Sequence, residues 1–201
     1  NALIVSVSGT GMFGRTSSDG ATNAFGGGNP GAGTMSIYTV FTPASLLANS
    51  GRTTIGATPS AAMAGHFKRG SSFNVNGSGR LSALTAYVDG LGGATGTQRM
   101  RMSVYRDANG RPGARISQSA EALLPSGSWG RWITMPTEPT TFEAGRYWIV
   151  MHTGGTGGVM RSYADGSGNW IGNADAYADG ATPNFGAGTS GNGTISAFAS
   201  Y

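Results

Sequence analysis

Gln98-Arg-Met-Arg-Met-Ser-Val-Tyr105 is the stretch whose pattern is easiest to interpret. Its apolar side chains, Met100, Met102 and Val104, fall on one side of an extended chain, and the residues between them are arginine or serine. A period of two residues is typical of a β-strand with one buried face, whereas an amphipathic helix has a period of 3.6 residues. This stretch therefore predicts a β-strand with one buried, apolar face and one polar face.

Strand patterns return along the rest of the chain. Residues 81–88 alternate with apolar side chains on both faces, and residues 147–151 form a continuous apolar and aromatic run typical of a central strand. Turn pairs such as Asp-Gly, Asn-Gly and Pro-Gly separate these stretches at roughly regular intervals, which indicates a sandwich or a barrel. Only residues 44–49 and 119–124 fit short helical turns. The predicted fold class is all-β.

Two segments of the chain are copies of each other. Residues 19–41 read DGATNAFGGGNPGAGTMSIYTVF, and residues 179–201 read DGATPNFGAGTSGNGTISAFASY. They align without a gap at an offset of 160 (179 − 19), with 11 identical positions in 23. The similarity continues upstream, where residues 2–7 match residues 159–164. A repeat of this length indicates one structural unit present more than once.

The repeat predicts the domain organisation. We expect residues 42–201 to form a complete module and residues 1–41 to be the C-terminal part of a preceding copy. That part contains two expected strands, residues 2–7 and 34–41. The residues we expect to take part in assembly are the apolar ones on these strands, namely Ala2, Leu3, Ile4, Val5, Val7, Met35, Ile37, Tyr38 and Phe41.

A family resemblance is carried by several motifs in order. They are RTTIGAT at 52–58, LSALTAYVDG at 81–90, VYRDANGRPGA at 104–114, FEAGRYWIVMHTG at 142–154, NADAYADG at 173–180 and a terminal Ile-Ser-x-x-x-x-Tyr. Over about residues 50–201 the chain resembles a jelly-roll-like β-sandwich module of secreted bacterial proteins and of phage tail and fibre proteins. The resemblance implies an antiparallel β-sandwich that binds glycans or acts as a spacer, and it supplies no catalytic residues.

The composition indicates a folded chain with few charges. Charged residues make up 11% of it, against about 25% in ordinary soluble domains. The absence of cysteine excludes a disulfide framework, a thiolate metal site and a thiol nucleophile. The net charge of +4 comes from scattered arginines and a single lysine, so we expect no nucleic-acid partner. No apolar run is long enough to insert into a membrane. A Ser-, Thr-, Gly- and Asn-rich chain of this kind favours an extracellular or virion-surface location.

The ionisable residues do not form a recognisable catalytic pattern. His66 and His152 lie at the ends of expected strands, and we interpret both as structural histidines. Most of the aspartates lie in Asp-Gly or similar turns, where local hydrogen bonding accounts for them. No Gly-x-Ser-x-Gly motif is present. The sequence predicts no catalytic residue and no cofactor, with a structural Ca²⁺ near Asp165, Asp175 or Asp179 as the weak alternative, because carboxylates in Gly-rich loops offer the oxygen ligands that Ca²⁺ prefers.

Aromatic and arginine side chains are the candidates for glycan contact. Trp170 lies in a Gly-Ser-Gly-Asn-Trp loop and is the best candidate for a ring that stacks on a sugar. Trp129 and Trp132 differ by three positions, so on a strand they face opposite ways and one of them is a second candidate. Arg99 and Arg101 could clamp an acidic sugar, although such residues more often form a solvated sheet face. Trp148 is expected in the core.

The partial repeat suggests a function. Residues 1–41 cannot take their usual places in the 42–201 module, because that module has its own copies. They belong to a preceding module, complete another subunit by strand addition, or pack as extra strands on their own domain. The first two make a head-to-tail contact, which builds a filament unless it closes into a ring. We expect a non-catalytic filament or fibre subunit whose partners are copies of itself; the alternative is a glycan-binding module of a secreted enzyme or phage tail protein.

Overall fold

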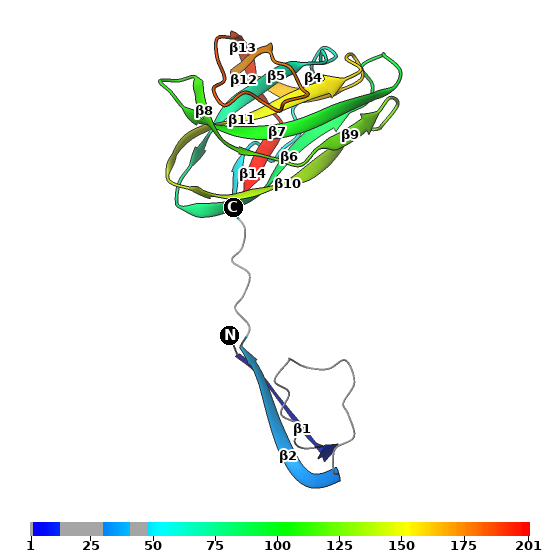
Figure 1. Ribbon diagram of the computed structural model, residues 1–201, viewed down its shortest axis with the longest axis vertical. Helices are drawn as coiled ribbons and strands as arrows, with labels where there is room; N and C mark the ends of the chain where they lie inside the picture. Colours follow the sequence, from blue (N-terminus) through cyan, green and yellow to red (C-terminus); the bar gives the residue numbers. More distant parts are fainter. Residues whose placement is uncertain (1, 13–29, 41–47) are drawn as a thin grey trace. The chain divides into compact units, whose positions relative to one another are not determined.

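The computed structural model describes residues 2–12, 30–40 and 48–201, and no described residue is helical. The chain divides into two compact units, Asn1–Leu46 and Leu47–Tyr201 (Figure 1). The all-β fold class predicted from the sequence is confirmed. In the described part there is no helix that is both long and apolar enough to cross a membrane.

The first unit contains an antiparallel hairpin. Strand β1 (Ala2–Met12) pairs with β2 (Pro30–Val40) from Ala2↔Val40 to Met12↔Pro30 without a register shift. Both strands are longer than the sequence pattern predicts. Phe41 and the repeat residues 19–29 lie outside the described residues.

Twelve strands form the second unit. In the first half of this unit they are β3 (Asn49–Gly51), β4 (Thr58–Pro59), β5 (Phe67–Val75), β6 (Gly79–Asp89), β7 (Thr97–Asp107) and β8 (Pro112–Gln118). In the second half they are β9 (Ala122–Pro125), β10 (Arg131–Phe142), β11 (Gly145–Gly155), β12 (Arg161–Ala174), β13 (Thr189–Ile195) and β14 (Ala197–Ser200).

Strand pairing arranges the second unit as an antiparallel sandwich. One layer has the order β10–β6–β14–β3. The other has the order β13–β12–β5–β11–β7, with β8 and β9 along the far edge of β7. Strand β12 joins the layers, because its first residues pair with β6 and its last residues pair with β5. The short strand β4 also pairs with β12.

The main core lies between the two layers. Met100, Met102 and Val104 of β7 are fully buried and belong to one cluster with apolar residues of β6 and β11. Because β6 and β7 belong to different layers, this cluster fills the space between them. The face predicted from the alternation at residues 98–105 is therefore confirmed. The expected helical turn at residues 119–124 is wrong, because this segment contributes β9 along the edge of β7.

A second buried cluster covers the outer face of the larger layer. It consists of Tyr105, Trp148, Val150, Ile171, Ala181 and Phe185. Alternation along β11 explains it, since Tyr147, Ile149 and Met151 enter the main core and the residues between them point outward. The segment between β12 and β13 lies over this face and supplies Ala181 and Phe185. Trp148 is buried as expected, and its indole N–H donates to Asp107 Oδ1 over 2.7 Å.

Candidate functional site

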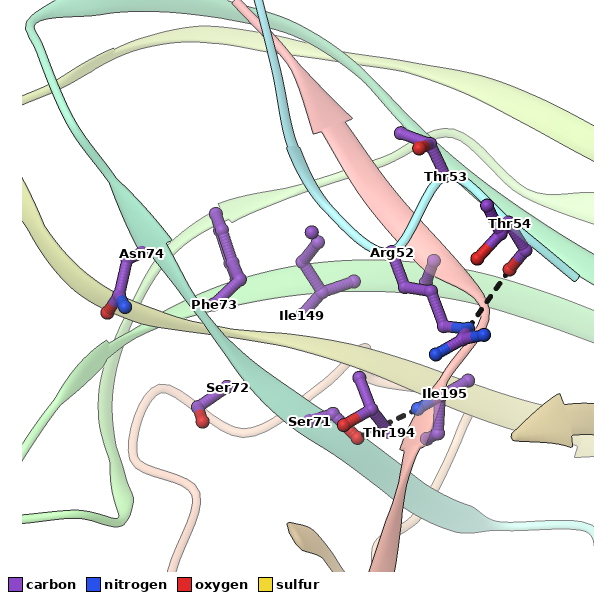
Figure 2. A pocket seen from close by; sticks show the side chains of 12 residues that line it. Arg52, Thr53, Thr54, Ser71, Ser72, Phe73, Asn74, Ile149, Thr194 and Ile195 are labelled. Carbon is purple, nitrogen blue, oxygen red and sulfur yellow. Dashed lines mark hydrogen bonds between the residues drawn. The ribbon is translucent and has the colours of Figure 1, made fainter. Parts of the chain in front are cut away.

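A groove of ≈ 450 Å³ opens at one edge of the sandwich (Figure 2). Residues 51–54 after β3, residues 71–74 of β5, and residues of β11, β13 and β14 line it. Phe73, Ile149 and Ile195 bring apolar surface of the main core to it. Hydroxyl, amide and guanidinium groups surround this apolar floor, namely those of Arg52, Thr53, Thr54, Ser71, Ser72, Asn74 and Thr194.

The groove exists because β12 leaves the larger layer. The last pair between β12 and β5 at this end is Trp170↔Ser71. The residues of β12 that precede Trp170 turn toward the other layer, where Arg161 and Ser162 pair with β6. Residues 72–75 of β5 continue to pair with β11 on their other side. Among the described strands, none pairs with the β12-facing edge of these residues. An exposed strand edge beside apolar surface suits an extended chain, whose backbone pairs with the edge and whose side chains reach the floor.

Hydrogen bonds hold the polar part of the groove in place. The Ser71 hydroxyl accepts the Ile195 N–H over 3.1 Å, and Arg52 Nε donates to the Thr54 carbonyl over 3.1 Å (Figure 2). The Arg52 guanidinium also pairs with Asp165, whose other oxygen accepts the Ala57 N–H over 2.9 Å. The cation at the groove is therefore already engaged by a carboxylate.

A second polar site is buried beneath the segment that follows β12. Lys68 Nζ lies 3.0 Å from Asp175 Oδ2, and the two side chains are only 1% and 8% exposed. The amine also donates to Thr182 Oγ1 over 2.6 Å and to the Phe185 carbonyl over 3.2 Å. Burial lowers the pKa of Lys68 below its ordinary value, although the Asp175 carboxylate works in the opposite direction. Sequence reasoning missed this site.

The histidines lie next to this buried pair. His152 is fully buried, its Nε2 lies 3.1 Å from the Asp175 carbonyl, and its Nδ1 has no hydrogen-bond partner among the described residues. Because a carbonyl oxygen only accepts, Nε2 carries the proton. Burial lowers the pKa of His152, so the neutral form is favoured. His66 Nδ1 accepts the Tyr177 N–H over 3.2 Å. Both rings thus help to position the segment after β12.

The aromatic side chains proposed for glycan contact lie in different environments. Trp129 is 80% exposed and precedes β10. Trp132 packs edge-on against Tyr87 and Phe198, with ring centroids 5.4 Å away from each. Trp170 is half-buried against the main core, and the Arg69 guanidinium lies 4.4 Å from its ring centroid. Of these rings, Trp129 is the one that offers the most free surface.

The two arginines of the candidate clamp share a carboxylate within the chain. Arg99 and Arg101 lie 3.7 and 3.3 Å from the oxygens of Glu121, and Arg101 also covers the ring of Tyr177 at 4.8 Å. The Tyr177 hydroxyl donates to the same carboxylate over 2.9 Å. An acidic ligand would therefore compete with Glu121 for these guanidinium groups.

The three aspartates considered for Ca²⁺ have separate partners. Asp165 pairs with Arg52, Asp175 pairs with Lys68, and Asp179 is exposed. Within residues 48–201 and the β1–β2 hairpin, no group of three or more His, Asp or Glu side chains is gathered for a metal ion. A structural Ca²⁺ would need backbone carbonyls for most of its ligands.

A scan against protein-family models finds no match for the chain, and a search of curated proteins finds no relative.

Proposed function

We propose that the chain is a non-catalytic structural protein of an extracellular or virion-surface fibre, in which the β1–β2 hairpin completes the β-sandwich of another copy. The observation that carries this proposal is the register of two strand pairs, β1 with β2 and β12 with β13. The repeat aligns Val7 with Ala164 and Met35 with Ile195, and these partners pair in the same way in both copies, as Val7↔Met35 and as Ala164↔Ile195.

The next pair of residues agrees as well. Ser8 pairs with Thr34 in the first unit, and the aligned residues Asp165 and Thr194 pair in the second. The two registers diverge by two residues further along, because β12 has an irregularity after Asp165 that β1 lacks. This shared register at two successive residue pairs supports the interpretation of residues 1–41 as part of a second copy of the module.

The second unit has its own copy of this element in use. Strand β12 pairs with β5 and β6, and β14 pairs with β3 and β6. A second hairpin with the same pairing properties therefore fits the equivalent positions of a different copy, either a preceding module or a neighbouring subunit. The contact is head-to-tail and propagates unless it closes into a ring. The resemblance of residues 50–201 to modules of phage tail and fibre proteins supports the same proposal.

A proline in β1 is expected to prevent assembly. Val5 pairs with Ile37 in the middle of the hairpin, and proline there removes a backbone donor and disrupts the ladder. We expect fibres of the wild-type chain by electron microscopy, and a small, monodisperse Val5→Pro variant by sedimentation. Val5→Ile, which keeps the strand, is the matched control and should assemble. A wild-type chain that remains a monomer at every concentration contradicts the proposal.

The second candidate function, glycan binding, is favoured by the exposed ring of Trp129. Its face is free to stack on a sugar. Such a contact contributes about 1–1.5 kcal/mol, so its loss raises the dissociation constant roughly tenfold. On a glycan array we expect binding by the wild-type chain, reduced in Trp129→Ala and largely kept in Trp129→Phe. Leu123→Ala, which also removes an exposed apolar side chain, is the control. Equal binding by all four proteins would count against this function.

A further inference from the structure

Lys68 is the single lysine of the chain, and it is fully buried against a carboxylate. It is the second residue of β5 and pairs with Asn173 of β12, and Asp175 follows two residues later, just past the end of β12 at Ala174. Nζ and Oδ2 lie 3.0 Å apart. This contact joins two positions that are 107 residues apart in the sequence (175 − 68).

Aromatic rings enclose the pair. Nζ lies 4.6 Å from the ring centroid of Phe185 and 5.8 Å from that of Tyr105. The Tyr105 hydroxyl donates to the Thr182 carbonyl over 2.9 Å, which fixes the segment that covers the site. Burial raises the pKa of Tyr105 to about 12, a second sign that charge is disfavoured here. A buried ion pair loses the hydration of both charges, so reaction products without charge are favoured in such a place.

We propose that the Lys68 amine and the Asp175 carboxyl group condense to an amide bond in the folded chain. The Lys68 Nζ–Asp175 Cγ bond forms, the Cγ–Oδ2 bond breaks, and Oδ1 remains as the amide oxygen. Of the three ammonium protons, one stays on the new amide nitrogen and two leave with Oδ2 as a water molecule. Ammonium and carboxylate together hold every atom of the products, so the reaction needs no oxidant, reductant or other reactant.

Neighbouring groups are placed to assist the reaction. Oδ2 receives the first proton directly from Nζ, which leaves a neutral amine facing a neutral carboxylic acid. The Thr182 N–H donates to Oδ2 over 3.0 Å and holds the carboxyl group in place. The second proton also passes from Nζ to Oδ2 directly, because these atoms lie 3.0 Å apart. His152 acts by position: its Nε2–H donates to the Asp175 carbonyl over 3.1 Å and holds this residue against Lys68.

The amide would act as a covalent link in a chain without cysteines. It would fasten the segment after β12 to β5 on the outer face of the larger layer. It would also replace two buried charges by a neutral group. This inference concerns the second unit alone and does not depend on assembly through the hairpin.

The intact mass of the denatured wild-type protein tests the proposal. We expect a mass lower than the sequence mass by one water molecule, and a branched peptide that joins Lys68 to Asp175 after proteolysis. In Lys68→Arg the mass should equal the sequence mass, because the guanidinium does not condense. In Asp175→Asn the side-chain amide can still react, and the loss should be one ammonia molecule. His152→Gln should slow the reaction, seen as a mixture of both masses soon after synthesis.

A wild-type chain with its full sequence mass overturns the proposal. A different reaction can also remove one water molecule, since Asp-Gly pairs such as Asp179-Gly180 can form a cyclic imide. Such a loss would persist in Lys68→Arg and would give no branched peptide, and that result likewise overturns the proposal. The wild-type measurement decides the matter even where a variant fails to fold.

Discussion

Phe142→Ala is expected to lower the free energy of unfolding of the sandwich by about 3–5 kcal/mol, the usual cost of removing a buried phenylalanine ring from a core. Phe142 is the last residue of β10 and is fully buried. Its ring centroid lies 4.9 Å from that of Tyr147, 5.5 Å from that of Tyr201 and 6.2 Å from that of Phe73. The substitution removes apolar contacts and leaves a cavity between rings that are already packed against one another.

The reason for a large effect is the position of this aromatic group. Phe142 belongs to one layer, Phe73 and Tyr147 belong to the other, and Tyr201 follows β14 at the end of the chain. The four rings therefore hold the two layers together at one end of the sandwich. Partial collapse into the cavity would have to move a strand of one layer, which is why little relief is expected.

Urea unfolding followed by tryptophan fluorescence measures this effect. Leu123→Ala is the matched control, because Leu123 is a large apolar residue that is 56% exposed. We expect the control to change the free energy of unfolding by less than about 0.5 kcal/mol. If Phe142→Ala were as mild as the control, the two layers would not be packed through this ring.

Local patterns predicted the parts of the fold that depend on local chemistry. The alternation at residues 98–105 identified β7 and its buried face, and the apolar run at 147–151 identified the central strand β11. Residues 119–124 were wrongly expected to be helical because Ala, Glu and Leu favour helices, whereas pairing with β7 decides the structure here. Tertiary pairing outweighs a weak preference in a segment this short.

The groove and the buried pair could not be predicted in the same way. The groove depends on where β12 leaves the larger layer. The sequence offers only an indirect signal, the glycines at 166 and 168, in a stretch that was expected to be a loop and that belongs to β12. Gly168 has φ of +82°, and the register of β12 shifts at this point, as glycine in a strand often indicates. Lys68 could not be matched to Asp175 from the sequence, because the two residues are 107 positions apart and no motif near either one indicates the other (175 − 68).

Asp89 is another residue whose turn motif explained only part of its role. It precedes Gly90, and its Oδ1 accepts the Leu91 N–H over 3.0 Å, as expected for an aspartate in a turn. It is also fully buried, and Arg161 binds both of its oxygens, over 3.0 and 2.7 Å. The Tyr163 hydroxyl donates to Oδ2 over 2.6 Å. Because Arg161 pairs with Asp89 where β12 meets β6, these bonds hold the two layers together at their junction.

Asp89→Asn is therefore expected to lower the free energy of unfolding by about 3 kcal/mol at neutral pH, since it leaves Arg161 and Tyr163 without their charged acceptor. The matched control is Asp179→Asn, which makes the same change in an exposed Asp-Gly pair and should be close to neutral. Urea unfolding at pH 7 measures both variants. Equal stability of the two would show that the buried carboxylate contributes no more than a surface one.

The same carboxylate predicts how stability depends on pH. Burial works to raise the pKa of Asp89, but the hydrogen bonds from Arg161, Tyr163 and the Leu91 amide outweigh it, so the folded pKa lies below the ordinary value. A lowered pKa means that the folded state holds the proton less tightly than the unfolded state. The stabilisation is then complete above the unfolded pKa of about 3.9 and is lost as the pH falls through the folded value. We expect the wild-type chain and Asp179→Asn to lose stability steeply below about pH 4, and Asp89→Asn to lose much less over the same range. A variant that lost as much stability in acid as the wild type would assign the acid sensitivity to other carboxylates.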